Sequence, residues 1–361
     1  MDAHRCESPA TEWLRSDGPG TDVVVSSRVR MARNFAGLPF PTRAGKIERN
    51  QAMELARKVI LGAEIAPKMI WVDLDELPAL ESSVLVERHL ISKQHARGEP
   101  SRALAMSAPD ERVAIMVNEE DHLRMQVLRS GLAATEAFAH ISEIDDRLEA
   151  ATEYAYSSRF GYLTACPSNV GTGVRVSVML HLPALRISGE LEKVRRAAKA
   201  MNLAVRGFYG EGSEAIGDLF QLSNQTTLGK TEETIIADFE QTVIPQIIDY
   251  ERLARRQMLD KRRPVLEDHV FRALGTLRSA RLLKADEAMQ LLSLVRLGVV
   301  LNLVTDVSLQ TISGLVLLAQ PAHLQQALGK ELDQAGRRIH RADLIRAQLA
   351  PESNGRAPSL R

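Results

Sequence analysis

The chain has 361 residues, 46 basic and 46 acidic side chains, 45% hydrophobic residues and two cysteines. This length predicts about two domains, each long enough to bury a core of its own. Because the net charge is zero and no segment is strongly of one sign, the composition argues against a protein that binds nucleic acid.

The apolar runs are short, and the N-terminal residues lack the apolar centre of a signal peptide. A membrane-spanning helix needs about 18 apolar residues, so no membrane association is expected. Two cysteines cannot form a disulfide framework, which fits a reducing compartment. We therefore expect a cytoplasmic protein.

The first 250 residues alternate between short apolar runs and amphipathic segments. The apolar runs, bounded by Gly, Pro or Asn, predict strands at 23–30, 69–74, 112–117, 174–182 and 203–208. The spacing of apolar residues predicts helices at 48–61, 136–154 and 188–201. This part of the chain is expected to form an α+β domain.

After about residue 249 the pattern is helical throughout. Asp286 is a candidate N-cap, and Pro321 fits the first turn of a further helix. Apolar residues at helical spacing mark a last helix around Ile345. The polar tail 351–361 is expected to be disordered.

Arginine outnumbers lysine by 36 to ten. A GC-rich genome would account for most of this excess, but some arginines interrupt apolar strands. Arg28 and Arg30 share one face of the first strand, with Val29 on the other. Arg175 shares a strand face with Ser177, and Arg206 ends a strand before the glycine-rich segment 207–212.

Neighbouring guanidinium groups repel one another, by about 4 kcal/mol at 4 Å and an effective dielectric constant of 20. Solvated surface arginines remain one interpretation. The other is that the sheet gathers them into an anion site, because the planar guanidinium matches phosphate oxygens better than an ammonium does.

Two loop segments carry further reactive groups. The segment 118–124 (NEEDHLR) places three acids after a strand, either as a solvated turn or as a base and cation ligand, and Arg124 could return to the anion face. The segment 166–173 (CPSNVGTG) places Cys166 before an unusual turn. An inert buried cysteine is one interpretation. A thiol beside an arginine cluster would instead ionise readily and be reactive.

Other nucleotide and metal signatures fail. The segment 229–231 lacks the glycine spacing of a Walker A loop and fits a helix start better, with Glu232 and Glu233 in the first turn. The catalytic loop of protein kinases is absent. The histidines show no metal-ligand spacing, so no metal site on the protein is expected.

Five segments together resemble a known family. CPSNVGTG is similar to the active-site cysteine signature of the ATP:guanidino phosphotransferases, which include creatine and arginine kinases. The family's other catalytic blocks resemble SSRVR (26–30), NEEDHLR (118–124), GTGVRVSVM (171–179) and RGFYGE (206–211), in the same order. Within the family, the likeness is greatest to the bacterial protein arginine kinases. Only 25 residues precede Ser26, where the kinases of small substrates carry a helical domain, and the C-terminal helical region matches the protein arginine kinases.

The resemblance implies an antiparallel sheet flanked by helices, followed by an all-α C-terminal domain. The expected organisation is an N-terminal extension (1–22), a guanidino-kinase-like catalytic domain (23–252), a helical domain (253–350) and the tail (351–361). The implied activity is transfer of the ATP γ-phosphoryl group to arginine side chains of proteins, in stress response and protein quality control. ATP and Mg²⁺ are the implied cofactors.

The resemblance also implies residue roles. Glu120 and Glu211 would hold the acceptor guanidinium, beside the reactive Cys166. Five arginines would hold the ATP phosphates: Arg28, Arg30, Arg124, Arg175 and Arg206. The rest of the ATP site would comprise Ser26, Ser27, Val29, His89, Val176, Ser177, Val178, Met179, Gly207, Phe208, Tyr209, Gly210 and Glu211. Without the resemblance, His89 is interpreted as a helix-surface histidine.

The C-terminal region departs from the family pattern. Protein arginine kinases carry an Arg-Asp-x-x-Arg-Ala motif that implies a regulatory phosphoarginine pocket. The matching residues here are Arg337, Arg338 and Arg341, and Arg338 replaces the acid. We therefore expect this pocket to be weakened or lost, and Arg337 and Arg341 can equally be solvated helix residues.

The implied partners are protein substrates with exposed arginine, Clp-type protease machinery, a stress-gene repressor, a zinc-binding activator and a second copy of the chain in a homodimer. Two other functions remain: a non-catalytic adaptor that binds arginine or phosphoarginine segments, and a kinase of a small guanidino compound.

Overall fold

The computed structural model describes residues 11–208 and 216–350, and these residues fall into two compact units. The first unit ends at Arg256 and the second begins at Gln257, a few residues after the expected boundary at 252. The expected tail 351–361 lies outside the described residues. No described helix is long and apolar enough to cross a membrane.

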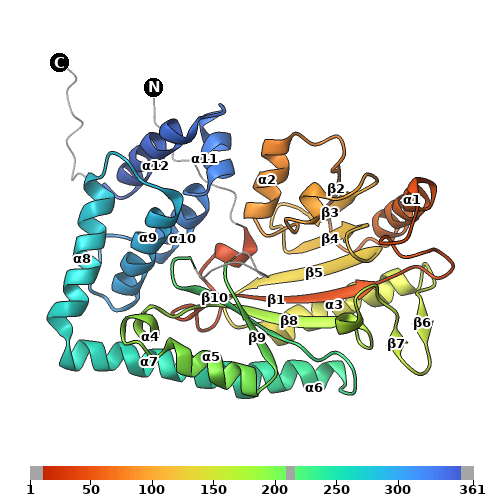
Figure 1. Ribbon diagram of the computed structural model, residues 1–361, viewed down its shortest axis with the longest axis horizontal. Helices are drawn as coiled ribbons and strands as arrows, with labels where there is room; N and C mark the ends of the chain where they lie inside the picture. Colours follow the sequence, from red (N-terminus) through yellow and green to blue (C-terminus); the bar gives the residue numbers. More distant parts are fainter. Residues whose placement is uncertain (1–10, 209–215, 351–361) are drawn as a thin grey trace. The chain divides into compact units, whose positions relative to one another are not determined.

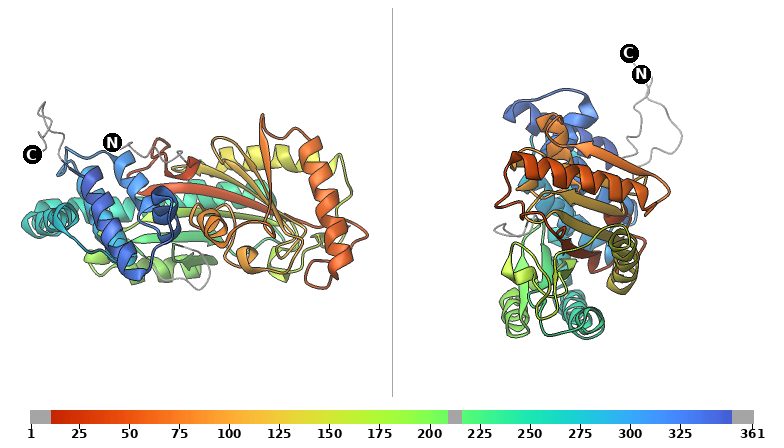
Figure 2. Two further views of the ribbon diagram at one scale, coloured as in Figure 1. Left: turned by 90° about the horizontal axis from the view of Figure 1, so that it is seen from above. Right: turned by 90° about the vertical axis from the view of Figure 1, so that its right-hand side faces the viewer.

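The N-terminal unit is built on an eight-stranded antiparallel sheet (Figure 1). In spatial order its strands are β2 (Met69–Asp73), β3 (Ala103–Ser107), β4 (Val113–Val117), β5 (Leu123–Ser130), β1 (Val24–Arg33), β8 (Val174–His181), β10 (Leu219–Asn224) and β9 (Leu203–Arg206). The strands fan out because the sheet is twisted, as the view from above shows (Figure 2). A separate two-stranded ribbon pairs β6 (Tyr156–Ser157) with β7 (Gly161–Tyr162).

Helices and short turns connect these strands. The helices of the unit are α1 (Lys46–Gly62), α2 (Ala79–Glu87), α3 (Ala134–Glu149), α4 (Pro183–Ile187), α5 (Leu191–Ala200), α6 (Glu232–Ala237) and α7 (Ile244–Lys261), the last of which crosses the unit boundary. The 3₁₀ turns are η1 (Glu12–Leu14), η2 (His95–Arg97) and η3 (Pro167–Asn169), and a π-helical segment, η4, spans Asp238–Val243.

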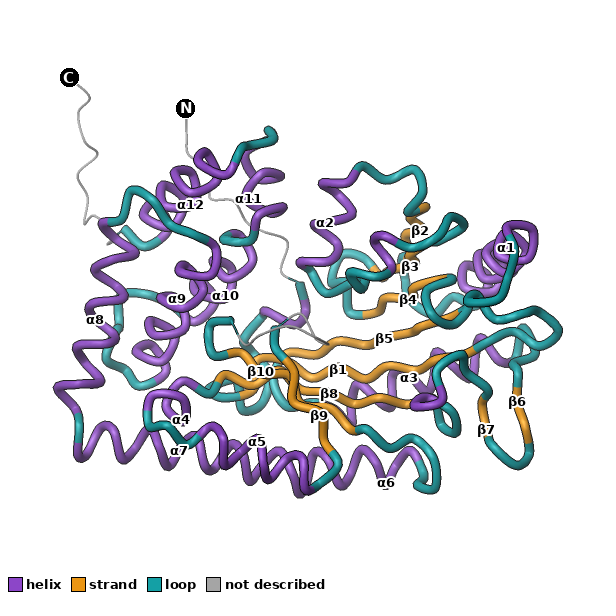
Figure 3. Tube along the Cα trace, in the orientation of Figure 1, coloured by secondary structure: helices purple, strands orange, loops and turns teal. Residues whose placement is uncertain are grey.

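The described part of the C-terminal unit contains helices and no strands (Figure 3). These helices are α8 (Arg263–Ser279), α9 (Ala285–Val300), α10 (Leu309–Leu318), α11 (Pro321–Leu328) and α12 (Gln334–Gln348). α8 and α9 approach closely at Gly298, where a Cβ atom would lie 2.4 Å from Val270 Cγ1. The sheet flanked by helices and the helical C-terminal region confirm the expected fold class.

The two faces of the central sheet have different chemistry. Along β1, β5 and β8 one set of alternate residues is apolar and packs against α3, which contributes Ile141, Ile144 and Leu148. On the opposite face, α2 and η2 cover β3 and β4 through a cluster that includes Leu85, Leu104 and Met116. This cover ends at β5, so the same face of β5, β1 and β8 is left for polar side chains.

The expected elements are present, with three corrections. Helix α3 ends at Glu149 and not at 154, because residues 153–155 instead hydrogen-bond to the backbone after β1. Helix α9 begins at Ala285 with Lys284 as its N-cap, so Asp286 lies in the first turn and is not the cap. The expectations also lacked β3, β5, β10 and α2.

Candidate active site

Side chains from six strands meet in a cavity of about 310 Å³ on the polar face of the sheet. The strand register explains why they meet, because Arg30 lies opposite Gln126 of β5 and Arg175 of β8. Arg206, at the end of β9, lies opposite Gln221. All five arginines expected at the phosphate site line the cavity: Arg28, Arg30, Arg124, Arg175 and Arg206.

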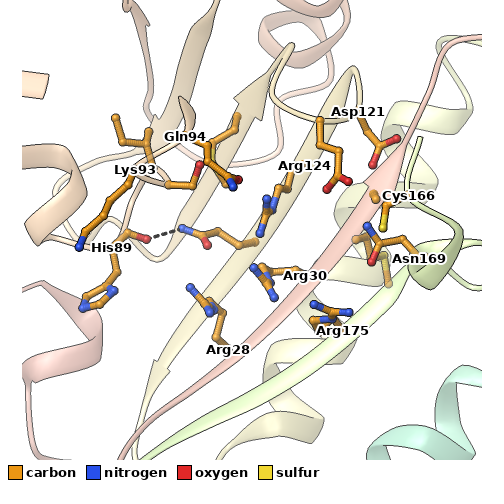
Figure 4. A pocket seen from close by; sticks show the side chains of 18 of the residues that line it. Arg28, Arg30, His89, Lys93, Gln94, Asp121, Arg124, Cys166, Asn169 and Arg175 are labelled. Atoms are coloured by element: carbon orange, nitrogen blue, oxygen red, sulfur yellow. Dashed lines mark hydrogen bonds between the residues drawn. The ribbon is translucent and has the colours of Figure 1, made fainter. Parts of the chain in front are cut away.

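The cavity has two chemically distinct ends, with the arginines between them. His89 and Lys93 lie at one end, and Asp121 and Cys166 at the other (Figure 4). This spatial order of side chains along the cavity suits an elongated ligand whose anionic part lies in the middle.

The arginine cluster is electrostatically costly without an anion. Burial, and then the charges of Arg124, Arg206 and Arg175, lower the pKa of Arg28 to about 9. Burial and the charge of Arg28 also lower the pKa of Arg30 well below its ordinary value. Within the described residues, the buried Nε of Arg30 has no hydrogen-bond partner. A polyanion would supply acceptors and offset the repulsion.

The three consecutive acids have different environments. Glu119 accepts hydrogen bonds from Ser92 Oγ (2.6 Å) and Arg124 Nη1 (2.7 Å). Burial opposes ionisation of Glu119, but the Arg124 charge and these hydrogen bonds lower its pKa to about 2. Asp121 is buried, and its Oδ1 accepts hydrogen bonds from Asn34 Nδ2 and Ala165 N, both at 2.7 Å.

Glu120 lies between these two and lines the cavity. Its carboxylate has no hydrogen-bond or ion-pair partner among the described residues. Of the three acids, Glu120 is therefore the one whose carboxylate is available to a ligand.

The loop that carries Cys166 is held at several points. Asp121 binds Ala165 N, and Thr227 Oγ1 donates to the carbonyls of Ser168 (2.9 Å) and Val170 (2.8 Å). Gly171 has φ of 109°, and a Cβ there would lie 2.5 Å from the Thr227 carbonyl oxygen. The glycine is needed for this close approach.

Arg33 fixes the other end of this loop. Its side chain is 1% exposed, donates to Thr172 O at 2.9 Å and pairs with the Asp145 carboxylate at 2.5–3.2 Å. Cys166 itself is half-buried and lines the cavity, with Sγ 3.0 Å from Ser168 Oγ. Cys166 is therefore not a buried residue, and its reactivity stays a prediction.

His89 follows α2 with φ of 60° and its ring lies against Phe208, at 5.0 Å between ring centroids. Burial, and then the charges of Arg28 and Lys93, lower the pKa of His89 to about 3, so its ring is neutral. A smaller cavity of about 20 Å³ adjoins this end and shares Arg28 and His89 with the larger one. Ser26, Ser177, Val178 and Met179 line it. The interpretation of His89 as a helix-surface histidine is wrong.

Some expected ATP-site residues lie elsewhere. Val29 and Val176 are opposite one another on the apolar face of the sheet and are fully buried. Ser27 is also fully buried, where its Oγ donates to Gly131 O and accepts from Ala133 N. Because side chains alternate along a strand, these three side chains cannot reach the cavity. Gly207 is buried directly after β9, and Tyr209, Gly210 and Glu211 lie outside the described residues.

In the C-terminal unit, Arg341 is 3% exposed and donates to the carbonyls of Ala319 and Leu283. Its interpretation as a solvated helix residue is therefore wrong. Arg337 is half-buried and donates to Leu332 O. The backbone carbonyl of Arg338 accepts from Leu283 N. Arg338 and Arg341 both lie on α12, and each hydrogen-bonds to the backbone of Leu283, which precedes α9.

Sequence reasoning missed several residues at the site. Gln126 and Gln221 line the cavity. Gln126 shares a strand with Arg124, whereas Gln221 lies on a strand without arginine and reaches the site through its pairing with Arg206. Asn34 and Trp13 carry no pattern in the sequence that points to the site. Their contacts are with residues distant in the chain.

Comparisons with known proteins agree with this geometry. The family described as "ATP:guanido phosphotransferase, C-terminal catalytic domain" matches residues 51–254, and the "Protein-arginine kinase McsB C-terminal domain" matches residues 263–358. A protein-arginine kinase of Halothermothrix orenii is 43% identical over 94% of this chain and 96% of its own length.

Solved structures of the same fold include two kinases. The duplicated taurocyamine kinase of Schistosoma mansoni is 26% identical with a TM-score of 0.56, over 64% of this chain and 33% of that one. Lombricine kinase is 26% identical with a TM-score of 0.54, over 68% of this chain and 71% of that one. The chain therefore belongs to the ATP:guanido phosphotransferase family.

Proposed function

We propose that the protein transfers the γ-phosphoryl group of ATP to arginine side chains of proteins. The observation that carries this proposal is the single cavity in which five arginines lie beside an available carboxylate, Glu120, and a thiol, Cys166. The arginines suit a polyphosphate, and the carboxylate suits a guanidinium. The relative from Halothermothrix orenii is named a protein-arginine kinase.

The acceptor guanidinium is a poor nucleophile because it stays protonated, with a pKa above about 12. Glu120 binds its N–H groups, orients the attacking nitrogen and accepts a proton as the N–P bond forms. Glu211 is proposed as the second carboxylate on the basis of the family resemblance. The proposed role of Cys166 is to contact the same guanidinium.

The arginines stabilise the charge that spreads over the transferred phosphoryl group. Because they are carried on paired strands, they need little reorganisation as the reaction proceeds. Asp121 and Asn34 set the position of the Cys166 loop relative to Glu120. Catalysis is thus mainly orientation and electrostatic stabilisation.

Magnesium is proposed to enter with ATP. The described residues contain no group of three or more His, Cys, Asp or Glu side chains that could hold a metal ion. Mg²⁺ is commonly held by substrate phosphates and water with one or two carboxylates, and Asp121 lines this cavity. When bound, it would neutralise phosphate charge.

The wider setting is proposed from the family resemblance. It comprises the cytoplasm, a stress response, a Clp-type protease, a stress-gene repressor and a zinc-binding activator as partners, and a homodimer. Replacement of the motif acid by Arg338 supports a weakened response to free phosphoarginine, because a cation there would repel its guanidinium.

The activity is tested by incubating the protein with MgATP and an arginine-rich protein and detecting acid-labile phosphoarginine by mass spectrometry. Free arginine and lombricine are assayed in parallel, since a kinase of small guanidino compounds would favour them. We expect phosphoarginine on the protein substrate. Binding of the substrate without any phosphorylation would instead support a non-catalytic adaptor.

A further inference from the structure

Trp13 lies at the nucleotide end of the site although it precedes the catalytic sheet by ten residues of loop and turn. Its side chain is 2% exposed and lines the smaller cavity together with Arg28, His89 and Gln221. These last three residues also line the larger cavity. Trp13 thus lies directly behind the site in which we place ATP.

The indole contacts both aromatic rings of this end. Its ring centroid lies 4.8 Å from that of His89, edge-to-face at 88°, and 6.1 Å from that of Phe208. His89 and Phe208 are in turn edge-to-face, 5.0 Å apart. The three rings form a closed triangle, in which each ring restricts the other two.

Hydrogen bonds fix the position of the indole. Trp13 Nε1 donates to the carbonyl of Arg88, the residue immediately before His89, at 3.1 Å. The Arg88 side chain is held by Glu111 at 2.8 Å. Trp13 therefore contacts both the ring of His89 and the backbone that leads into its left-handed conformation.

The segment that carries Trp13 is itself anchored to the sheet. Glu12 N donates to Asp110 O, and the amides of Asp17 and Gly18 both donate to Ser130 Oγ at 3.2 Å. A Cβ atom at Gly18 would lie 1.9 Å from Ser130 O, so the segment lies directly on the end of β5. The backbone around Trp13 is consequently fixed on the sheet, and the indole is a buried part of the nucleotide end of the site.

We propose that Trp13 is a positioning residue of the nucleotide site. It holds the His89 imidazole and the Phe208 ring in the arrangement against which the nucleoside of ATP packs. It therefore controls the affinity for nucleotide and not the acceptance of the protein substrate. This inference rests on the proposed use of ATP. The neutral state of His89, whose pKa is lowered by burial, is consistent with a ring that packs against an uncharged base.

Tryptophan fluorescence tests the proposal directly, because the chain has only two tryptophans, Trp13 and Trp71. Trp71 lies on the edge strand β2 beneath Arg57 and does not line either cavity. In W71F, where Trp13 is the sole indole, we expect saturating MgADP to change the emission. In W13F, where Trp71 is the sole indole, we expect no change.

Steady-state kinetics provide the second test. We expect W13L to raise KM for ATP roughly tenfold, because both of the ring contacts of Trp13 are lost. The expected kcat and KM for the protein substrate stay within about twofold of wild type. W13F, which keeps a ring but loses the indole N–H, should fall between wild type and W13L, and W71L is the matched control.

Several results would overturn the inference while leaving the proposed function intact. One is an unchanged emission of W71F at MgADP concentrations that saturate the protein by equilibrium dialysis. Another is a folded W13L, by circular dichroism, with wild-type KM for ATP or an equal rise in KM for the protein substrate. If W13L does not fold, the KM of W13F for ATP and the fluorescence titration test the proposal in its place. Absence of nucleotide binding by the wild-type protein would instead refute the proposed function.

Discussion

Asn34, the residue directly after β1, links the two parts of the acceptor end. It is 1% exposed, and its Nδ2 donates to Asp121 Oδ1 at 2.7 Å and to Leu163 O at 3.1 Å. Its Oδ1 accepts from His122 N at 2.9 Å. Because Asp121 also binds Ala165 N, Asn34 joins the turn that carries Glu120 to the loop that carries Cys166.

We predict that N34A lowers both stability and turnover. The substitution removes three hydrogen bonds, of which two are worth about 1 kcal/mol each and the one to the Asp121 carboxylate about 1.5–3 kcal/mol. The expected loss is about 4 kcal/mol, a large part of the roughly 5–15 kcal/mol that stabilises a protein of ordinary stability. A shift of about 1 Å between Glu120 and Cys166 would lower kcat about 100-fold.

Asn224 offers a matched variant for this prediction. Its amide is also buried and also makes three hydrogen bonds, accepting from Val176 N and donating to Val174 O and Thr226 O. It therefore holds β8, on which Arg175 lies, and not the acceptor end. We expect N224A to lose similar stability but to raise KM for ATP.

Urea unfolding and steady-state kinetics of the two variants separate stability from positioning. We expect N34A to lower kcat and to leave KM for ATP near wild type, whereas N224A should raise KM for ATP and leave kcat near wild type. If the two variants show the same change in kcat and KM at equal stability, the role assigned to Asn34 is refuted.

Other predictions address the acids, the pH dependence and the anion site. We expect E120Q to abolish phosphoarginine formation while MgADP binding survives. E119Q frees Arg124 and should instead change nucleotide affinity. Equal loss of phosphoarginine formation and of MgADP binding in both variants would contradict this. Burial lowers the pKa of His122 to about 4, and its Nδ1 accepts from Phe35 N. The unfolded chain then binds a proton below about pH 6.5 that the folded chain does not bind until about pH 4. His122 should therefore contribute a fall in stability of about 2 kcal/mol at pH 5. The difference between the urea midpoints of wild type and H122Q measures this contribution, because His89 and His95, whose pKa values are also lowered, titrate in both proteins. If the fall in stability between pH 6.5 and pH 4 is the same in H122Q as in wild type, His122 is excluded as its source. MgADP at about 100 times its Kd should stabilise the protein by about 2.7 kcal/mol in thermal unfolding, and by much less in R30A.

The sequence was sufficient to predict the arginine face. The period of two along a strand determines which residues share a face, so Arg28 and Arg30 could be separated from Val29 without coordinates. The same rule, applied to Ser27 and Val176, would have excluded their side chains from the ATP site. The family resemblance included them because a motif is a contiguous string, whereas a cavity is lined by alternate residues.

The sequence could not distinguish between the three acids by their environment. Glu119, Glu120 and Asp121 are consecutive, and their roles depend on Arg124, Asn34 and the loop at 165. Contacts between residues so distant in the chain leave no local pattern. Strands β3 and β5 were missed for a related reason, since their pairing and not their composition defines them.

On β1 and β8, one face carries the arginines of the phosphate site and the other face is apolar and stabilises the fold. Every described arginine of the phosphate site on these strands alternates with a residue that is almost fully buried, such as Val29, Met31 or Val176. Repulsion among the arginines opposes folding of the empty protein, so the apolar face against α3 must offset it. Burial of each such side chain contributes about 1.5–3 kcal/mol. A substitution on the apolar face should therefore act mainly through stability, whereas one on the arginine face acts on ATP and can even stabilise the empty protein.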